Sequence, residues 1–510
     1  MRWLLSWLVS IISLGVSLGL LRVAGVVVAD PYPRFEIGDI DTVQSIIDTN
    51  VAAVTAAIGV LIALVLLTVQ FTAQRYSYDV IRIFIQSWVN AALIGFSIVT
   101  ISFNLWLGTL LKSDDIPVAA TILAVSLTTA CFAFLPPYIV YLFDLLWPEN
   151  LLNYLQRELL KALDVSKRPT DVARRQAAAY DRMDQMTDIA LTAVNLSDSS
   201  LARHSIWVLY LATARYVENK KAFGPEWFIV QEAESEEHDD LIVGEIEAAG
   251  TWLEWRMLSE VEEVFYATLN RAREVNNLIA RVARLLGEKA VECEDAGLLR
   301  TLMKFFNTFL REAINRGDVR AGYHVLYQYR RLADAALERH PEVALEIADR
   351  LSYYGNAATS GPLLWMLAAA AHDLRILAEN CHRRGGDCQI TAAIVADLFD
   401  TVEGAEEKQS PALVQLYKTL TALGSFFLVR GDLELARQLR AKLAHVPDAT
   451  LEQVRRELTA CENPVFWEVT DRVVNFDFVE PDVRAGLPAF LEPVERWAHS
   501  PHPSRLRGTP

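Results

Sequence analysis

The chain has 510 residues, 52% of them hydrophobic, and a formal net charge of −16. That length suits two or three domains of about 100–200 residues each. The acidic balance argues against a general nucleic-acid binder, which needs a basic surface, so no nucleic-acid partner is expected. Five scattered cysteines suit a reducing compartment better than a disulfide framework.

Four stretches before residue 148 are apolar enough to span a bilayer, which takes roughly 20 residues of helix. Pro136 and Pro137 in the fourth stretch are expected to kink it or to end its regular part. The first stretch could instead be a cleaved signal peptide, although its apolar region exceeds the usual length of about 7–15 residues. The predicted spans are 3–29, 51–69, 88–111 and 117–147.

The orientation follows from the lysines and arginines near the span ends. Segment 30–50 holds one arginine among five acidic residues, so it is expected outside. Segment 70–87 contains Arg75 and Arg82, and basic residues follow the fourth span, so both are expected inside. The pattern predicts a multi-pass protein of the cell membrane with both termini cytoplasmic and the lipid bilayer as its first partner.

The joint between the second and third spans, VQFTAQRYSYDVIRIF (69–84), carries a group of polar side chains. The plain interpretation is a turn whose arginines satisfy the positive-inside rule. Alternatively, because no glycine or proline forces a turn, two helices could project into the cytoplasm and present a surface. The candidate residues of this surface are Gln70, Gln74, Arg75, Tyr78 and Arg82.

Polar side chains within the spans are mostly hydroxyls, which serve as packing contacts between helices. Asn90 and Asn104 lie 14 residues apart on roughly one helical face, and each should face protein or water. Apart from Arg22 and Asp144 near span ends, no ionisable residue is clearly embedded, which argues against a proton pump. A passive pore stays possible, with Asn90, Ser97 and Asn104 as its candidate lining.

From residue 150 onward the hydrophobic pattern is helical. The acidic cluster at 232–240 matches no calcium loop, so a solvated charge run is favoured over a metal site. PLLWMLAAAA (362–371) is too short to span a membrane and indicates a buried core helix. Apolar stripes at 302–313 and 413–427 predict further amphipathic helices.

Two junctions between predicted helices are alike, NRGDVRAGYHVL and VRGDLELARQLR. Gly317 and Gly431 can adopt the left-handed conformation that ends a helix, and Asp318 and Asp432 can cap the next one. Tetratricopeptide-like hairpins have such junctions, but the separation here is not a multiple of their repeat of about 34 residues. The sequence therefore predicts an irregular stack of helical hairpins.

The search for chemistry finds no P-loop, GxGxxG, GxSxG or HExxH motif. CHRRGGDC (381–388) holds the one close cysteine pair, and His382 does not complete a zinc ligand set. Cys381 and Cys388 are expected to flank a turn at Gly385 and Gly386. We therefore expect no enzyme activity, no cofactor and no metal.

Two phrases resemble an uncharacterised bacterial membrane-protein family, domain of unknown function 2254. QFTAQRYSYD (70–79) is similar to its Gln-x-x-x-x-Gln-(Tyr/Phe)-Ser-Pro-Arg phrase, with Tyr78 and Asp79 replacing the last two residues. ALTAVNLSDSSL (190–201) is similar to a second phrase but lacks its prolines. The resemblance covers roughly the first 220 residues and implies several spans with a cytoplasmic remainder. It adds Asn195 and Asp198 as a hypothetical partner surface for the joint.

Taken together, the sequence predicts an all-α integral membrane protein with four N-terminal spans and a large cytoplasmic helical domain. The expected function is that of a membrane-anchored scaffold or sensor that acts through protein–protein contacts. The alternative is an oligomeric ion channel or passive pore lined by spans two and three and gated by the cytoplasmic helices. A homo-oligomer or other protein partners are expected. The predicted parts are 1–147 (spans), 148–240 (juxtamembrane), 241–498 (hairpins) and 499–510 (disordered tail).

Overall fold

The computed structural model describes seven segments of the chain, and among them it contains helices and no strand. One isolated antiparallel bridge joins Val465 and Val474. The chain forms two compact units, Met1–Leu155 and Gln156–Pro510, and it passes from one to the other within α6 (Pro148–Ala162). The described segments are 39–75, 88–111, 118–165, 171–230, 239–358, 363–468 and 472–499.

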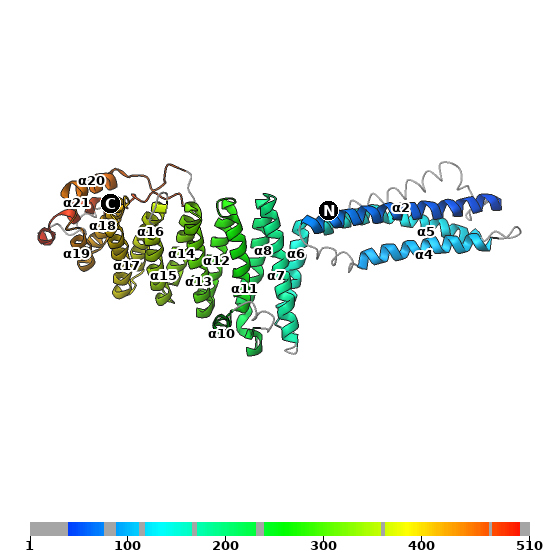
Figure 1. Ribbon diagram of the computed structural model, residues 1–510, viewed down its shortest axis with the longest axis horizontal. Coiled ribbons are helices and arrows are strands. Elements are labelled where there is room, and N and C mark those ends of the chain that lie inside the picture. Colours follow the sequence, from blue (N-terminus) through cyan, green and yellow to red (C-terminus); the bar gives the residue numbers. More distant parts are fainter. Residues whose placement is uncertain are drawn as a thin grey trace, which may run out of the picture. The chain divides into compact units, whose positions relative to one another are not determined.

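The first unit contains three long helices, α2 (Ile40–Arg75), α4 (Trp88–Leu110) and α5 (Val118–Leu146), shown in Figure 1. Each carries a stretch long and apolar enough to cross a membrane. Three of the four predicted spans are therefore present. The predicted first span, 3–29, lies outside the described residues.

Two expectations for these helices need correction. Helix α2 begins at Ile40 rather than near residue 51, because Asp39 caps it by accepting a hydrogen bond from the Thr42 amide at 3.2 Å. Helix α5 continues through Pro136 and Pro137, so the expectation that they end its regular part is wrong, while a kink there stays a prediction. Prolines are tolerated in such helices because neighbouring helices and side chains satisfy the backbone groups that proline leaves unpaired.

The buried face of α4 repeats every seven residues, in alternating steps of three and four. This is the spacing of helices that pack side by side as in a coiled coil. The opposite face exposes apolar side chains, among them Ile98, Val99 and Trp106, as lipid contact requires. The buried positions are Asn90, Leu93, Ser97, Thr100, Asn104 and Leu107.

The second unit is a two-layer stack of antiparallel helical hairpins (Figure 1). Each helix packs against its hairpin partner and against the next helix of its own layer, which is the arrangement of an α-solenoid. The first layer is α7 (Val172–Asn195), α11 (Trp252–Thr268), α13 (Ala296–Asn315), α15 (Pro341–Ala357) and α17 (Cys388–Glu407). The second layer is α8 (Ser199–Asn219), α12 (Arg273–Cys293), α14 (Val319–Ala336), α16 (Leu364–Arg383) and α18 (Leu413–Arg430).

Shorter elements complete this unit. The turns η2 and η3 and helix α10 lie between α8 and α11, and three more helices and the turn η5 follow α18. The connection between α20 and α21 contains the antiparallel bridge between Val465 and Val474. The bounds are η2 (Lys220–Ala222), η3 (Pro225–Phe228), α10 (Asp240–Ala249), α19 (Leu433–Lys442), α20 (Asp448–Ala460), α21 (Pro481–Leu491) and η5 (Val494–His499).

The predicted hairpin junctions are confirmed. Gly317 and Gly431 have φ values of 65° and 87°. Asp318 accepts a hydrogen bond from Ala321 at 3.0 Å, and Asp432 caps α19 in the same way. The predicted core helix is also confirmed, because the run 366–371 within α16 is buried.

Candidate functional site

The three candidate pore residues lie in the interior of the first unit. Asn90, Ser97 and Asn104 are 4%, 1% and 1% exposed, respectively. The Tyr138 hydroxyl donates to Asn90 Oδ1 at 3.2 Å, and Asn50 Nδ2 donates to Asn104 Oδ1 at 3.3 Å. These are contacts between α4 and its two neighbours, α5 and α2, so the side chains act as packing contacts in this arrangement.

Ser97 occupies the middle of the same face. Its hydroxyl donates to the Leu93 carbonyl at 2.8 Å and lies 3.4 Å from Cys131 Sγ on α5. All three candidates therefore use their polar atoms within the three-helix unit. This placement does not favour a water-filled path between α2, α4 and α5.

The candidate joint surface is divided between the two units. Gln70 is exposed on α2, and Gln74 and Arg75 form the end of that helix. Tyr78 and Arg82 lie outside the described residues. In the second unit, Asn195 ends α7, and Asp198 caps α8 by accepting from the Leu201 amide at 3.0 Å. Because these residues belong to different units, their pairing stays a prediction.

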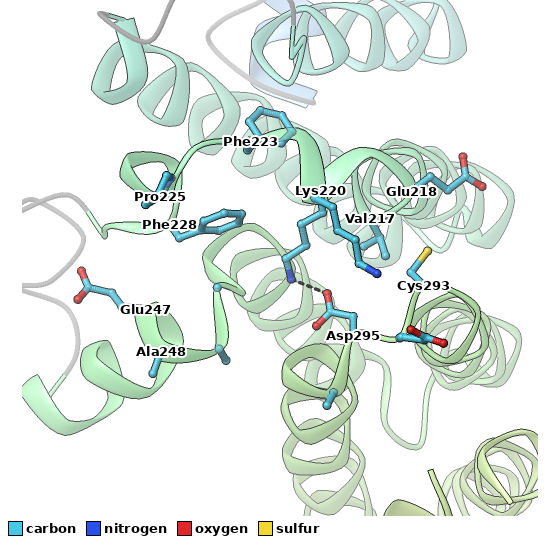
Figure 2. Close-up of a pocket in the computed structure, with 15 residues that line it drawn as sticks. Val217, Glu218, Lys220, Phe223, Pro225, Phe228, Glu247, Ala248, Cys293 and Asp295 are labelled. Carbon is cyan, nitrogen blue, oxygen red and sulfur yellow. Dashed lines mark hydrogen bonds and ion pairs between the residues drawn. The ribbon is translucent and has the colours of Figure 1, made fainter. Parts of the chain in front are cut away.

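A pocket of about 690 Å³ lies where the segment after α8, the end of α10 and the α12–α13 turn meet (Figure 2). Lys220 extends toward its floor. The Lys220 ammonium lies 2.7 Å from Glu254 Oε1 and 2.7 Å from Asp295 Oδ2. These three residues come from η2, α11 and the cap of α13, so the ion pairs join three elements.

The electrostatics of this cluster keep Lys220 charged. Burial alone would lower the pKa of Lys220, but the carboxylates of Glu254 and Asp295 raise that pKa above its ordinary value. Burial raises the pKa of Glu254, and Lys220 partly offsets that effect. Burial also raises the pKa of the neighbouring Cys293 thiol. Neither the protonated amine nor the protonated thiol is an activated nucleophile, so the cluster is suited to holding the fold together.

Sequence reasoning missed this cluster, because its members come from three separate segments of the chain. The available signal was the cap, since Asp295 follows a helix and accepts from the Leu298 amide at 2.9 Å. Its second carboxylate oxygen is the one that pairs with Lys220. One aspartate thus both starts α13 and anchors the buried lysine.

A second pocket, of about 430 Å³, lies at the starts of four second-layer helices. Arg273, Arg320, Trp365 and Gln415 line it from the first turns of α12, α14, α16 and α18. Its other wall is formed by residues 466–468 and 474–477 of the connection between α20 and α21, where the antiparallel bridge between Val465 and Val474 holds two parts of the chain side by side. The aromatic lining consists of Tyr323, Trp365, Phe466, Trp467 and Phe476.

Buried contacts hold the second part of this connection, from Arg472 to Phe476, in place. Arg472 Nη1 donates to Asp373 Oδ1 at 2.9 Å, and Nη2 donates to the Tyr323 carbonyl at 2.6 Å. The Arg472 guanidinium also lies 4.1 Å from the centre of the Tyr323 ring. Phe476 stacks on His372 with ring centres 4.2 Å apart. Residues of α14 and α16 thus fix the position of this pocket wall.

His372 is neutral in this environment. Burial holds its pKa well below the ordinary value, and the cations Arg375, Arg472 and Arg330 act in the same direction. Among the residues that the structure describes, no three His, Cys, Asp or Glu side chains are grouped to hold a metal ion. The cysteine pair flanks the expected turn, with Cys381 buried, Cys388 exposed and Gly385 at a φ of 70°.

Comparisons with known proteins match different extents of the chain. No curated protein matches it. A solved structure described as "Circular tandem repeat protein with novel repeat topology and enhanced subunit contact surfaces" is similar, at 15% identity and a TM-score of 0.36. That similarity covers 86% of this chain and 96% of the other. The family described as "Predicted membrane protein (DUF2254)" matches residues 2–197, which confirms the resemblance seen in the sequence.

Proposed function

We propose that the protein is a membrane-anchored scaffold or sensor whose helical unit binds other proteins on the cytoplasmic side of the cell membrane. The observation that carries this proposal is the two-layer stack from α7 to α18. In such stacks each hairpin contacts only its neighbours, so the stack builds a long surface that solenoid proteins use for binding. The apolar helices of the first unit supply the anchor.

The cytoplasmic location rests on charge. Arg75 and Arg82 fall at one end of the second and third spans, and basic residues between 157 and 175 follow the last one. Lysine and arginine near span ends stay on the cytoplasmic side during insertion. With the four proposed spans, this charge pattern supports a cytoplasmic position for both termini and the second unit.

The proposal is tested by photocrosslinking the full chain in its own membrane. Azidophenylalanine replaces, one at a time, Tyr266, Tyr353 and Trp365, which are 47%, 60% and 60% exposed on the stack. Tyr354, which is adjacent to Tyr353 but 4% exposed, is the matched control. We expect at least one exposed position to form an adduct of defined mass with another protein, and the control position to form none. Absence of adducts from all three exposed positions would count against the proposal.

A further inference from the structure

We propose that the pocket between the starts of α12, α14, α16 and α18 and residues 466–468 and 474–477 binds a small planar aromatic anion. Such a ligand is a ring that carries a phosphate or a carboxylate. This goes beyond partner binding by the stack and does not depend on it. The proposal rests on three features of the pocket, namely its size and aromatic lining, its prepositioned rings and its charge.

The size and lining fit a small ring-bearing ligand. The pocket volume of about 430 Å³ lies in the range of about 300–1,000 Å³ that is typical of small-molecule sites. Trp365 and Trp467 are 60% and 79% exposed, which is unusual for side chains whose burial would be favourable. A planar ligand would cover both.

Two of the rings are already held in position. Phe476 is fixed by its stack on His372, and Tyr323 by the guanidinium of Arg472 against its face. Arg472 is itself held by Asp373, which also accepts from Arg330 Nε at 3.1 Å. Because these rings need not be ordered on binding, less conformational entropy is lost.

The charge of the lining favours an anion. Four helices begin at the pocket, and helix starts carry partial positive charge. Arg273 and Arg320 add two full charges. Of the two acidic lining residues, Asp477 accepts a hydrogen bond from Gln415 Nε2 at 2.8 Å and pairs at 2.8 Å with Lys418, which also pairs with Glu457. The other, Glu468, is exposed at the rim. With two arginines in an acidic chain, a small anion fits better than a nucleic acid.

The test is calorimetric titration of the full chain in detergent with phenyl phosphate. We expect saturable binding at one site. Inorganic phosphate, which lacks the ring, and benzyl alcohol, which lacks the charge, should each bind at least about tenfold more weakly, as loss of one charged or stacking contact implies. A parallel titration with benzoate identifies whether the site prefers carboxylate or phosphate.

Variants locate the site. Arg320→Gln and Trp365→Ala should each weaken phenyl phosphate binding about tenfold. Arg316→Gln is the matched control, since Arg316 caps the end of α13 outside the pocket lining, with its guanidinium 4.2 Å from the centre of the Tyr266 ring. Unchanged thermal unfolding of a variant confirms that it is folded. If either pocket variant is not folded, Arg273→Gln is titrated in its place. Failure of both aromatic anions to bind, equal binding of benzyl alcohol, or full binding by the two pocket variants would overturn the proposal.

Discussion

Lys220 has almost no exposed surface, yet its ammonium is charged between two carboxylates. Removing three charges from water is costly, and the pairing only offsets that cost. The cluster therefore adds little net stability, but it constrains how these elements pack. Removing one partner from a buried ion pair leaves a buried charge uncompensated, which is strongly destabilising. The cluster ties the α7–α8 hairpin to the two hairpins that follow.

The first prediction concerns this lysine. Lys220→Met leaves Glu254 buried without a counter-charge, which should lower the free energy of unfolding by about 3–5 kcal/mol. Lys221→Met, at the adjacent exposed position, should leave it within about 0.5 kcal/mol of the parent. Urea unfolding of the full chain in detergent, followed by tryptophan fluorescence, measures both. Equal stability of the two variants would show that the buried ion pairs do not constrain the fold.

The second prediction concerns Asp397 on α17. Burial raises its pKa to about 7, and the nearby charges of Asp349 and Asp400 act in the same direction. In the unfolded chain the pKa is near 3.8, so the folded chain holds a proton that the unfolded chain loses between these values. Stability contributed at this position is therefore present at low pH and is lost as pH rises toward 7.

Asp397→Asn removes this titration. We expect the variant to have a higher Tm than the parent at pH 8 and a smaller loss of Tm between pH 4.5 and pH 8. Glu434→Gln on α19, where the carboxylate is 73% exposed, is the control and should reproduce the parent profile. A parent-like slope in Asp397→Asn would mean that this carboxyl titrates as in the unfolded chain.

At the scale of helices, some junctions between hairpins could be predicted from the sequence and others could not. Gly317 and Gly431 were recognisable because glycine favours positive φ. The same junction recurs at Ser197 and Glu294, with φ values of 60° and 56° and an aspartate cap following each. Without glycine these left-handed positions give no local signal. Backbone hydrogen bonds close both junctions, because the Asp198 amide donates to the Ala193 carbonyl at 2.8 Å and the Asp295 amide to the Ala290 carbonyl at 2.9 Å.

The third prediction concerns the contact between α18 and α21. A Cβ built on Gly424 would lie 2.1 Å from Phe490 Cζ, a distance that no relaxed contact allows. Gly424→Ala should therefore displace α21 and cost about 1–3 kcal/mol. Gly244→Ala on α10 is the matched control, because nothing lies within 4 Å of its built Cβ. The control should be neutral or stabilise by up to about 1 kcal/mol. Urea unfolding compares the two, and equal effects would contradict close packing at Gly424.

At the scale of the whole molecule, the sequence predicted classes of structure better than sites. Hydropathy identified the three apolar helices, and helical periodicity identified the hairpins, because both signals lie within one element. The two pockets could not be predicted. Arg273, Arg320, Trp365 and Gln415 lie at the starts of four helices, and only the stacking of one layer brings them together.

The fourth prediction tests orientation. Cys388 is exposed at the start of α17, while Cys131 and Cys381 are buried. A membrane-impermeant maleimide should label the chain in inverted membrane vesicles and not in intact cells, because the second unit is expected to face the cytoplasm. The Cys388→Ser variant identifies the labelled residue by loss of that signal. Labelling of Cys388 in intact cells would reverse the proposed topology.

The central claim is that the apolar helices anchor a binding stack and do not form a conducting path. Ion-flux recording on the purified full chain in lipid vesicles, with its oligomeric mass determined on the same sample, tests this claim most directly. We predict no flux above that of empty vesicles, because Asn90, Ser97 and Asn104 are bonded within the three-helix unit. A symmetric oligomer with reproducible conductance that changes in Asn104→Asp would contradict the account.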